Sequence, residues 1–160
     1  MELDKEKLKN FDKLPPDVRR QFSLLMNRYA EKKKQSKIKK DFMAFVKHVW
    51  PDFIEGKHHK EVAQKFNEIA DGKIKRVIIN MAPRHTKSEF ASYLLPAWMV
   101  GRNPKLKIIQ STNTTELSVR FGRKAKALMD SPEYKEVFKT RLKEDSQAAG
   151  KWETQQGGEY

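Results

Sequence analysis

The segment RVIINMAPRHTKS, residues 76–88, carries most of the information about the architecture of this chain. Its first part, Arg76 to Met81, is a short and nearly continuous run of β-branched and apolar side chains, as expected for a strand buried on both faces of a sheet. A loop follows from Ala82 to Thr86. From Lys87 onward the composition is helical, and Pro96 predicts a kink or an early end of that helix.

The next segment along the chain repeats this order. Leu106–Ser111 is a second apolar run that predicts a strand, and Thr115 to Met129 has the periodicity of an amphipathic helix. Strand, loop, helix, strand and helix in this order form a βαβ unit, whose strands are parallel and whose crossover is right-handed. We therefore predict an α/β fold with a parallel sheet flanked by helices.

The region before residue 76 is predicted to be helical. A helix opens at Pro15-Pro16 with apolar residues spaced four, three and four apart, and it runs into residues 31–40, which hold six lysines and one glutamate. This basic stretch is interpreted as a solvated linker or helix surface, with DNA contact as the alternative. Two further amphipathic helices are predicted at residues 42–50 and 59–70, and Gly72 suits a left-handed helix end.

Composition narrows the classes of function. The 160 residues suit one domain, and 34 Lys plus Arg against 21 Asp plus Glu give a formal charge of +13, which favours a polyanionic partner. The absence of cysteine excludes disulfides, thiolate metal sites and cysteine nucleophiles. No apolar run approaches the length of a membrane span, and the N-terminus has no signal core, so a cytoplasmic protein is expected.

The loop between the first predicted strand and its helix has the requirements of a phosphate site. Such a loop needs inward backbone N–H groups, a helix N-terminus, a lysine for the phosphates and a hydroxyl for Mg²⁺. Lys87 and Ser88 fit the last two roles. Met81 and Thr86 stand where the common G-x-x-x-x-G-K-[ST] pattern has glycine, so either the loop takes another path or the backbone at Thr86 is strained.

The continuous stretch from Ala82 to Phe138, together with KWETQQGGEY at residues 151–160, resembles phage terminase large subunits. Their Walker A loop reads P-P-R-x-G-K-S, and the likeness covers residues from about 40 to 160. The resemblance implies an additional-strand P-loop ATPase that uses ATP and Mg²⁺ to move double-stranded DNA into a procapsid. It also implies a portal protein, a small terminase subunit and a homo-oligomeric ring as partners, in the host cell cytoplasm.

The resemblance also implies roles for residues of the loop. Lys87 would contact the β and γ phosphates, Ser88 would hold Mg²⁺, and Arg84 would sense the γ phosphate, so Arg84 and Lys87 are the catalytic candidates. The nucleotide-binding segment is expected to comprise Pro83, Arg84, His85, Thr86, Lys87, Ser88 and Glu89. An arginine before a helix can also contact only solvent or a carboxylate, and a lone histidine is more often a surface or packing residue.

Two further regions are candidates for contact with ligands. The adenine pocket of the family lies upstream of the loop, which points to residues 50–59 and to Phe53, His58 or His59, with core packing as the alternative for Phe53. A basic helix carries Arg120, Arg123, Lys124 and Lys126 and is a candidate for contact with DNA or a neighbouring subunit, although a solvated helix face is the default.

The expected organisation is a helical basic extension, 1–40, followed by a partial ATPase domain, 41–160, with an incomplete sheet. No apolar run ending in an acidic pair follows Ser111, so the Walker B carboxylates needed for turnover are not visible. We therefore expect nucleotide binding without turnover at a motor's rate. The alternatives are a helicase-like translocase and a non-enzymatic basic DNA-binding protein.

Overall fold

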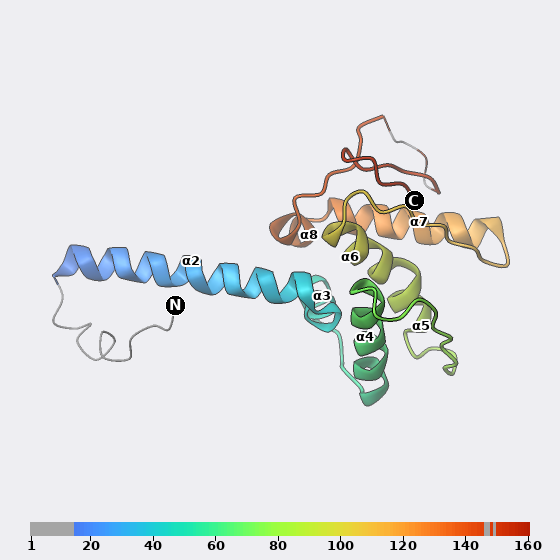
Figure 1. Cartoon of the computed structure of the whole chain (residues 1–160), viewed down its shortest axis with the longest axis horizontal. Coiled ribbons are helices and arrows are strands. Elements are labelled where there is room, and N and C mark those ends of the chain that lie inside the picture. Colours follow the sequence, from blue (N-terminus) through green and yellow to red (C-terminus); the bar gives the residue numbers. More distant parts are fainter. Residues whose placement is uncertain (1–14, 146–147, 149) are drawn as a thin grey trace. The chain divides into compact units, whose positions relative to one another are not determined.

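The computed structural model describes residues 15–145, 148 and 150–160, and the chain divides into two compact units, 1–36 and 37–160. Helix α2 (Pro16–Lys40) forms the described part of the first unit and continues into the second (Figure 1). Its predicted apolar stripe is largely exposed, since Val18, Leu25 and Tyr29 are 44%, 62% and 48% accessible. The lysine-rich residues 31–40 form the last turns of this helix and are mostly exposed, so of the two interpretations the helix surface is confirmed and the linker is wrong.

The second unit is helical. It consists of α3 (Phe42–Val49), α4 (Lys57–Ala70), α5 (Lys87–Glu89), η2 (Phe90–Leu94), α6 (Leu95–Arg102), α7 (Thr115–Asp130) and α8 (Pro132–Val137). Three of these, α3, α4 and α7, lie where the apolar periodicity predicts helices, which confirms that part of the prediction. Gly72 follows α4 with a φ of 72°, which confirms the left-handed helix end predicted for it.

Elements α5, η2 and α6 form one helix without a break, because Phe90 and Leu95 at the two junctions keep right-handed helical dihedrals. Its middle part, η2, is a π-helical turn in which the Leu95 amide donates to the Phe90 carbonyl. Pro96 has no N–H and its ring crowds the carbonyl four residues earlier, so the wider turn before it accommodates the proline. The helix therefore does not end early at Pro96.

Aromatic side chains fill the core between α3, α4 and the continuous helix formed by α5, η2 and α6. Phe42 lies at the centre, with ring centroids 5.1 Å from Phe66, 5.4 Å from Phe90 and 5.4 Å from Trp98 in edge-to-face contacts. The Phe42 amide also donates to Asn67 Oδ1 at 2.8 Å, which attaches the start of α3 to α4. These contacts hold the helix that begins at Lys87 against α3 and α4.

The predicted parallel sheet is absent: within the described residues there are isolated β-bridges but no strand, so the α/β P-loop fold class is wrong. A strand needs a neighbouring backbone to complete its hydrogen bonds. Residues 76–81 have no backbone hydrogen bond to another described segment, and residues 106–111 pair only with Glu159. The expected burial on both faces is also wrong, since Ile78 is 89% and Ile109 97% exposed.

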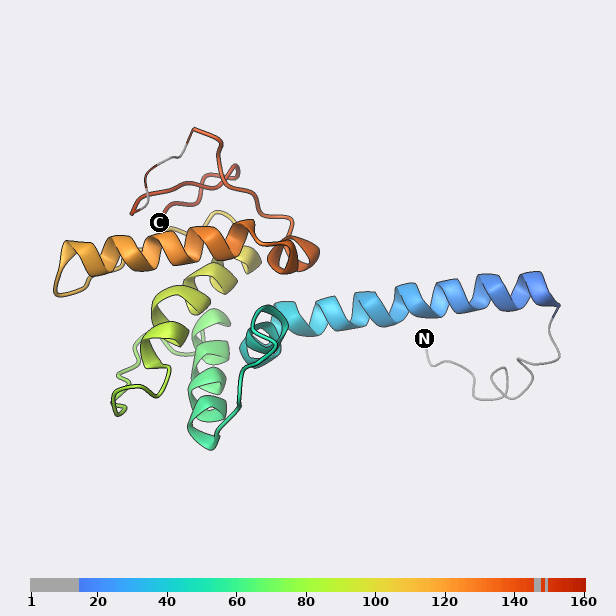
Figure 2. The ribbon, with the colours of Figure 1, turned by 180° about the vertical axis from the view of Figure 1, so that it is seen from behind.

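The C-terminal residues 150–160 lie beside α7 in both views of the ribbon (Figures 1 and 2). Backbone hydrogen bonds also join Glu159 to Leu106 and Ile108, in the segment before α7. Trp152 is fully buried, donates from Nε1 to the Gly122 carbonyl at 3.1 Å, and stacks on Tyr160 with ring centroids 4.8 Å apart. Trp152 therefore attaches the C-terminal residues to α7. Among the described residues, none of the helices combines the length and apolarity needed to cross a bilayer.

Candidate functional site

The loop before α5 contains two residues in the left-handed region. Arg84 has a φ of 64° and Thr86, the residue that caps the helix, a φ of 59°. A left-handed conformation is costly for a β-branched residue, by about 1–3 kcal/mol. Two outcomes were expected for Thr86, another loop path or a strained backbone. The structure has the strained backbone, because Thr86 adopts a conformation that favours glycine.

A chain of hydrogen bonds holds Thr86 in this conformation. The Gly56 amide donates to His59 Nδ1 at 2.9 Å, so the ring proton of His59 lies on Nε2. His59 Nε2 then donates to Thr86 Oγ1 at 2.6 Å, and this hydroxyl donates to the His85 carbonyl at 2.6 Å. The start of α4 thus fixes the geometry of the loop. No local pattern in the sequence indicates this contact between residues 27 positions apart.

Thr86→Val is expected to be less stable than Thr86→Gly. Valine keeps the β-branch in the left-handed region and leaves the partners of Oγ1 unpaired, so it should lower the free energy of unfolding by about 1–3 kcal/mol. Glycine loses the same bonds but relieves the strain, and should remain within about 1 kcal/mol of the wild type. Urea unfolding of the three proteins measures both differences; equal losses for Val and Gly would contradict a strained Thr86.

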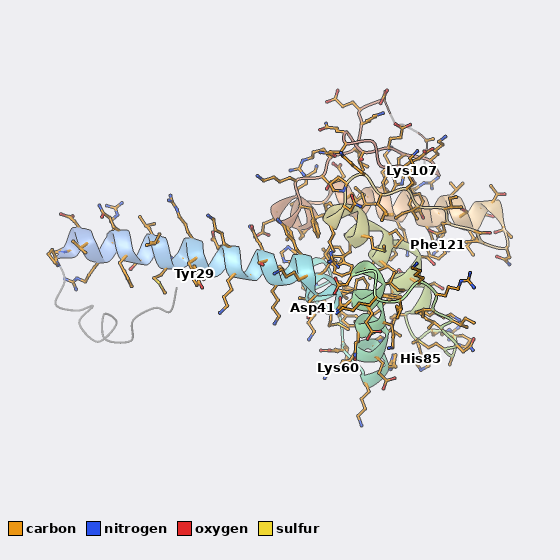
Figure 3. All side chains as sticks on the ribbon, viewed as in Figure 1. Tyr29, Asp41, Lys60, His85, Lys107 and Phe121 are labelled. Atoms are coloured by element: carbon orange, nitrogen blue, oxygen red, sulfur yellow. The ribbon has the colours of Figure 1, made fainter. Side chains whose placement is uncertain are left out.

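Three histidines gather beside the loop, His58 and His59 from α4 and His85 from the loop itself. The His58 ring centroid lies 3.8 Å from that of His59 and 5.5 Å from that of His85 (Figure 3 labels His85). Burial is the main cause that lowers the pKa of His59 below its ordinary value of 6.5, and the charge of His58 adds to it. His59 is therefore neutral near pH 7, in agreement with its hydrogen bonds.

This lowered pKa predicts a loss of stability in mild acid. A group with a depressed pKa in the folded state binds its proton more readily when unfolded. The contribution of His59 is therefore complete above its unfolded value of 6.5 and is lost as the pH falls through the folded pKa. The urea concentration at the unfolding midpoint should therefore decrease as the pH is lowered from 7.5 to 5. His59→Gln should flatten this dependence, whereas His48→Gln should not.

Cationic and hydroxyl groups of the loop face solvent. Arg84, His85, Lys87 and Ser88 are all exposed. Lys87 Nζ turns back toward the beginning of the loop and donates to the Met81 carbonyl at 3.4 Å, while His85 Nδ1 lies 2.9 Å from the Pro83 carbonyl. The lysine ammonium is thus held across the loop by one long hydrogen bond, which an anionic ligand can replace.

Glu89 has a different environment from the rest of the predicted segment. Both of its carboxylate oxygens accept from Lys124 Nζ of α7 at 3.1 Å. The same ammonium lies 5.1 Å from the centroid of the Tyr93 ring, and burial together with Glu89 raises the pKa of Tyr93 to about 12. Glu89 and Lys124 therefore join α5 to α7. On the predicted basic face of α7, Arg120 and Arg123 are exposed and Lys126 is half-buried.

The candidates for adenine contact are mainly engaged in packing. Phe53 is half-buried against Trp50, His59 and Phe90, with ring centroids 5.3, 4.8 and 5.4 Å away. His59 is occupied by Gly56 and Thr86. His58 differs, because its Nε2 atom is buried and has no hydrogen-bond partner.

The described residues contain no group of three or more His, Cys, Asp or Glu side chains arranged to hold a metal ion. Comparison of the chain with protein-family models, with curated proteins and with solved structures found no match.

Proposed function

We propose that this chain binds the phosphate groups of ATP at residues 82–88, as the nucleotide-binding part of a terminase large subunit that packages double-stranded DNA. One observation carries the proposal. Thr86 is held in a left-handed conformation directly before the helix that starts with Lys87, and the ammonium of Lys87 is turned across the loop. A backbone maintained at this energetic cost is characteristic of functional sites.

Three residues of the segment 82–88, Arg84, Lys87 and Ser88, have a chemical role in this proposal. Lys87 neutralises the charge of the terminal phosphates, and the exposed guanidinium of Arg84 can contact the same groups. The first amides of the helix supply hydrogen bonds and a favourable dipole. Magnesium would arrive with the nucleotide and screen the charge of its phosphates. The exposed Ser88 hydroxyl is its candidate protein ligand, since the described residues have no carboxylate cluster there.

A titration with ATP, AMP and adenosine tests the proposal. If the loop recognises phosphates, affinity should rise with the number of phosphate groups and adenosine should not compete. Direct binding of ATP with Mg²⁺ can be measured by calorimetry. Equal affinities for AMP and ATP, or no saturable binding at millimolar ATP, would contradict a triphosphate site.

The second candidate function is that of a basic DNA-binding module without nucleotide chemistry. The formal charge of +13 and the exposed Arg120 and Arg123 favour it. The two candidates differ in their response to ATP. Binding of a DNA duplex that is unaffected by mutation of the loop, together with no ATP binding, would favour the DNA-binding module.

A further inference from the structure

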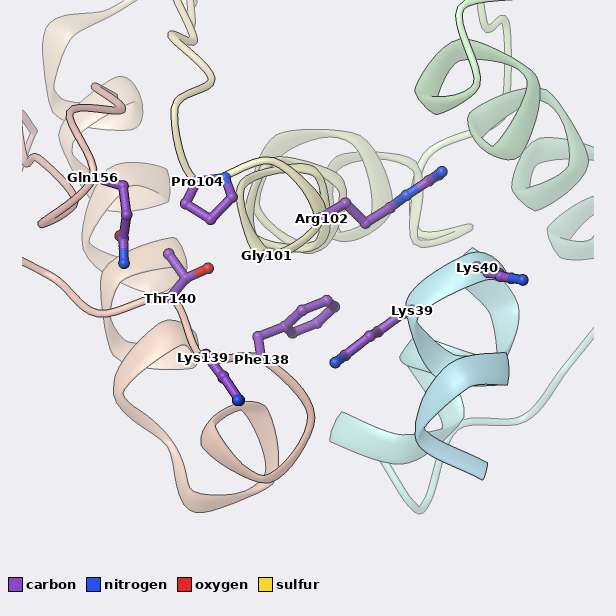
Figure 4. Close-up of a pocket in the computed structure, with 9 residues that line it drawn as sticks. All are labelled: Lys39, Lys40, Gly101, Arg102, Pro104, Phe138, Lys139, Thr140 and Gln156. Atoms are coloured by element: carbon purple, nitrogen blue, oxygen red, sulfur yellow. The ribbon is translucent and has the colours of Figure 1, made fainter. Parts of the chain in front are cut away.

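A second cationic site lies away from the loop, where the end of α2, the end of α6 and the segment after α8 meet (Figure 4). This pocket has a volume of about 390 Å³, which falls in the range of small-ligand sites. Four basic side chains line it, Lys39, Lys40, Arg102 and Lys139, and its lining contains no acidic residue. The pocket is thus suited to an anion.

Thr140 gives this pocket a buried polar group without a partner. The residue is 2% exposed, and its hydroxyl oxygen is buried and makes no hydrogen bond. Buried hydroxyl groups in folded proteins are nearly always hydrogen-bonded. In Figure 4 the Thr140 hydroxyl points toward the middle of the pocket, so an acceptor placed there would satisfy it.

The lysines of the pocket are not used in ion pairs. Among the described residues, Lys39, Lys40 and Lys139 have no salt bridge, whereas Lys124 is paired with Glu89. In Figure 4 Lys39 extends toward the Phe138 ring and Lys139 points away from it, while Lys40 and Arg102 point to the other side. Lys39, Lys139 and Thr140 all line the pocket, and the two long lysine side chains have the rotamer freedom to turn toward a ligand beside Thr140.

Arg102 adds a second unsatisfied donor at the rim. Its Nη2 atom donates to Asp71 Oδ1 at 2.9 Å, and its guanidinium lies 4.8 Å from the centroid of the Trp98 ring. Its Nη1 atom is buried and has no partner. The pairing with Asp71 fixes the orientation of the guanidinium and leaves Nη1 as a donor for an anion.

We propose that this pocket binds a phosphate group of the DNA backbone, with Thr140 donating a hydrogen bond and Lys39 and Lys139 neutralising the charge. A phosphate offers several acceptor oxygens and a full negative charge, which matches one hydroxyl donor and two unpaired ammonium groups. DNA is favoured over a free phosphate because the chain has a formal charge of +13 and Lys37 adds to Lys39 and Lys40 at the end of α2, a spacing of charge that suits repeated phosphates. The site is independent of the loop at residues 82–88.

Amide chemical-shift mapping of the full chain tests the location. Inorganic phosphate, ATP and a short DNA duplex are titrated separately. Shifts at Gly101 and Thr140 with the duplex at a lower concentration than with phosphate would support the DNA backbone as the source. Shifts at the same amides with phosphate or ATP alone would assign the site to a free phosphate and overturn the DNA part. No shifts at these amides with any probe would overturn the site.

Substitutions at Thr140 separate binding from folding. Thr140→Val removes the hydroxyl and should weaken binding of the duplex about tenfold, the effect of one hydrogen bond to a charged group. The melting temperature should not fall, because the buried hydroxyl it removes has no partner. Thr140→Ser keeps the donor and should bind within about twofold of the wild type. Equal binding by the Val and Ser variants would overturn the role of the hydroxyl.

The lysines are tested through the salt dependence of DNA binding. Each lost phosphate contact lowers the slope of log affinity against log salt by about 1, so Lys39→Met with Lys139→Met should lower it by about 2. The matched control replaces Lys57 and Lys75, two exposed lysines outside the pocket and outside residues 31–40. A slope that falls no more in the pocket variant than in this control would overturn the assignment.

Discussion

Lys87→Ala is expected to weaken ATP binding by about tenfold to a hundredfold, the worth of one hydrogen bond between charged groups. The ammonium of Lys87 is the charge that the loop holds in place, through its contact with the Met81 carbonyl at 3.4 Å. Alanine also removes the positive charge that offsets the terminal phosphates. Because the contact with Met81 is long and exposed, the fold should persist in the variant.

Calorimetric titration of ATP with Mg²⁺ into both proteins measures this effect. Lys60→Ala is the matched control, since it removes an exposed lysine from α4 and leaves the loop unchanged. The control should bind ATP as the wild type does. A Lys87→Ala variant that binds ATP with unchanged affinity would remove the loop from the proposed function.

Trp98→Ala is expected to lower the free energy of unfolding by about 3–5 kcal/mol. Trp98 is fully buried, contacts Phe42 edge-to-face, and donates from Nε1 to the Ile38 carbonyl at 3.1 Å. The substitution opens a cavity between α3 and α6, and it leaves the carbonyl without a donor. A loss of this size is a large part of the stability of a domain of this length.

Urea unfolding followed by circular dichroism measures this loss, with Trp50→Ala as the control of the same chemistry. Trp50 is only half-buried and packs at the edge of the core against Phe53. Its removal should cost less than half as much as that of Trp98. Equal losses would mean that the core is not centred where the aromatic contacts place it.

Packing of this core also fixes the position of the loop at residues 82–86. Phe90 follows directly after α5 and packs against Phe42, Phe53 and His59, so the helix that begins at Lys87 is fixed from its second turn. His59 in turn bonds to Thr86. The position of Thr86 therefore depends on α4 and on the aromatic core together.

The helices were predictable from the sequence, and the sheet was wrongly predicted. Periodic apolar positions in α3, α4 and α7 determine one buried face each, which is a local property. The runs at residues 76–81 and 106–111 have the composition of buried strands, but they form no strand. Composition does not supply the partner backbone that a sheet requires, and no described segment provides it for residues 76–81.

The candidate site was predictable only in part. The positions of Lys87 and Ser88 directly after a loop, at the start of a helix, follow from the order of elements, and strain at Thr86 was one of two outcomes expected from its β-branch. The engagement of Glu89 with Lys124 and the bond between His59 and Thr86 join residues 35 and 27 positions apart. Neither pair has a spacing that a helix or a turn could reveal.

Local chemistry alone was therefore enough to establish where this chain is helical, where it turns and which loop carries a lysine and a hydroxyl, because each depends on residues within a few positions of one another. The packing of α4 and α7 against the continuous helix α5–η2–α6 determined the geometry of the loop. It selects the neutral tautomer of His59 and holds Thr86 in a left-handed conformation, while the segment after α8 places Thr140 in a pocket that lysines also line. These features require contacts between distant segments, whose distances no short-range pattern specifies.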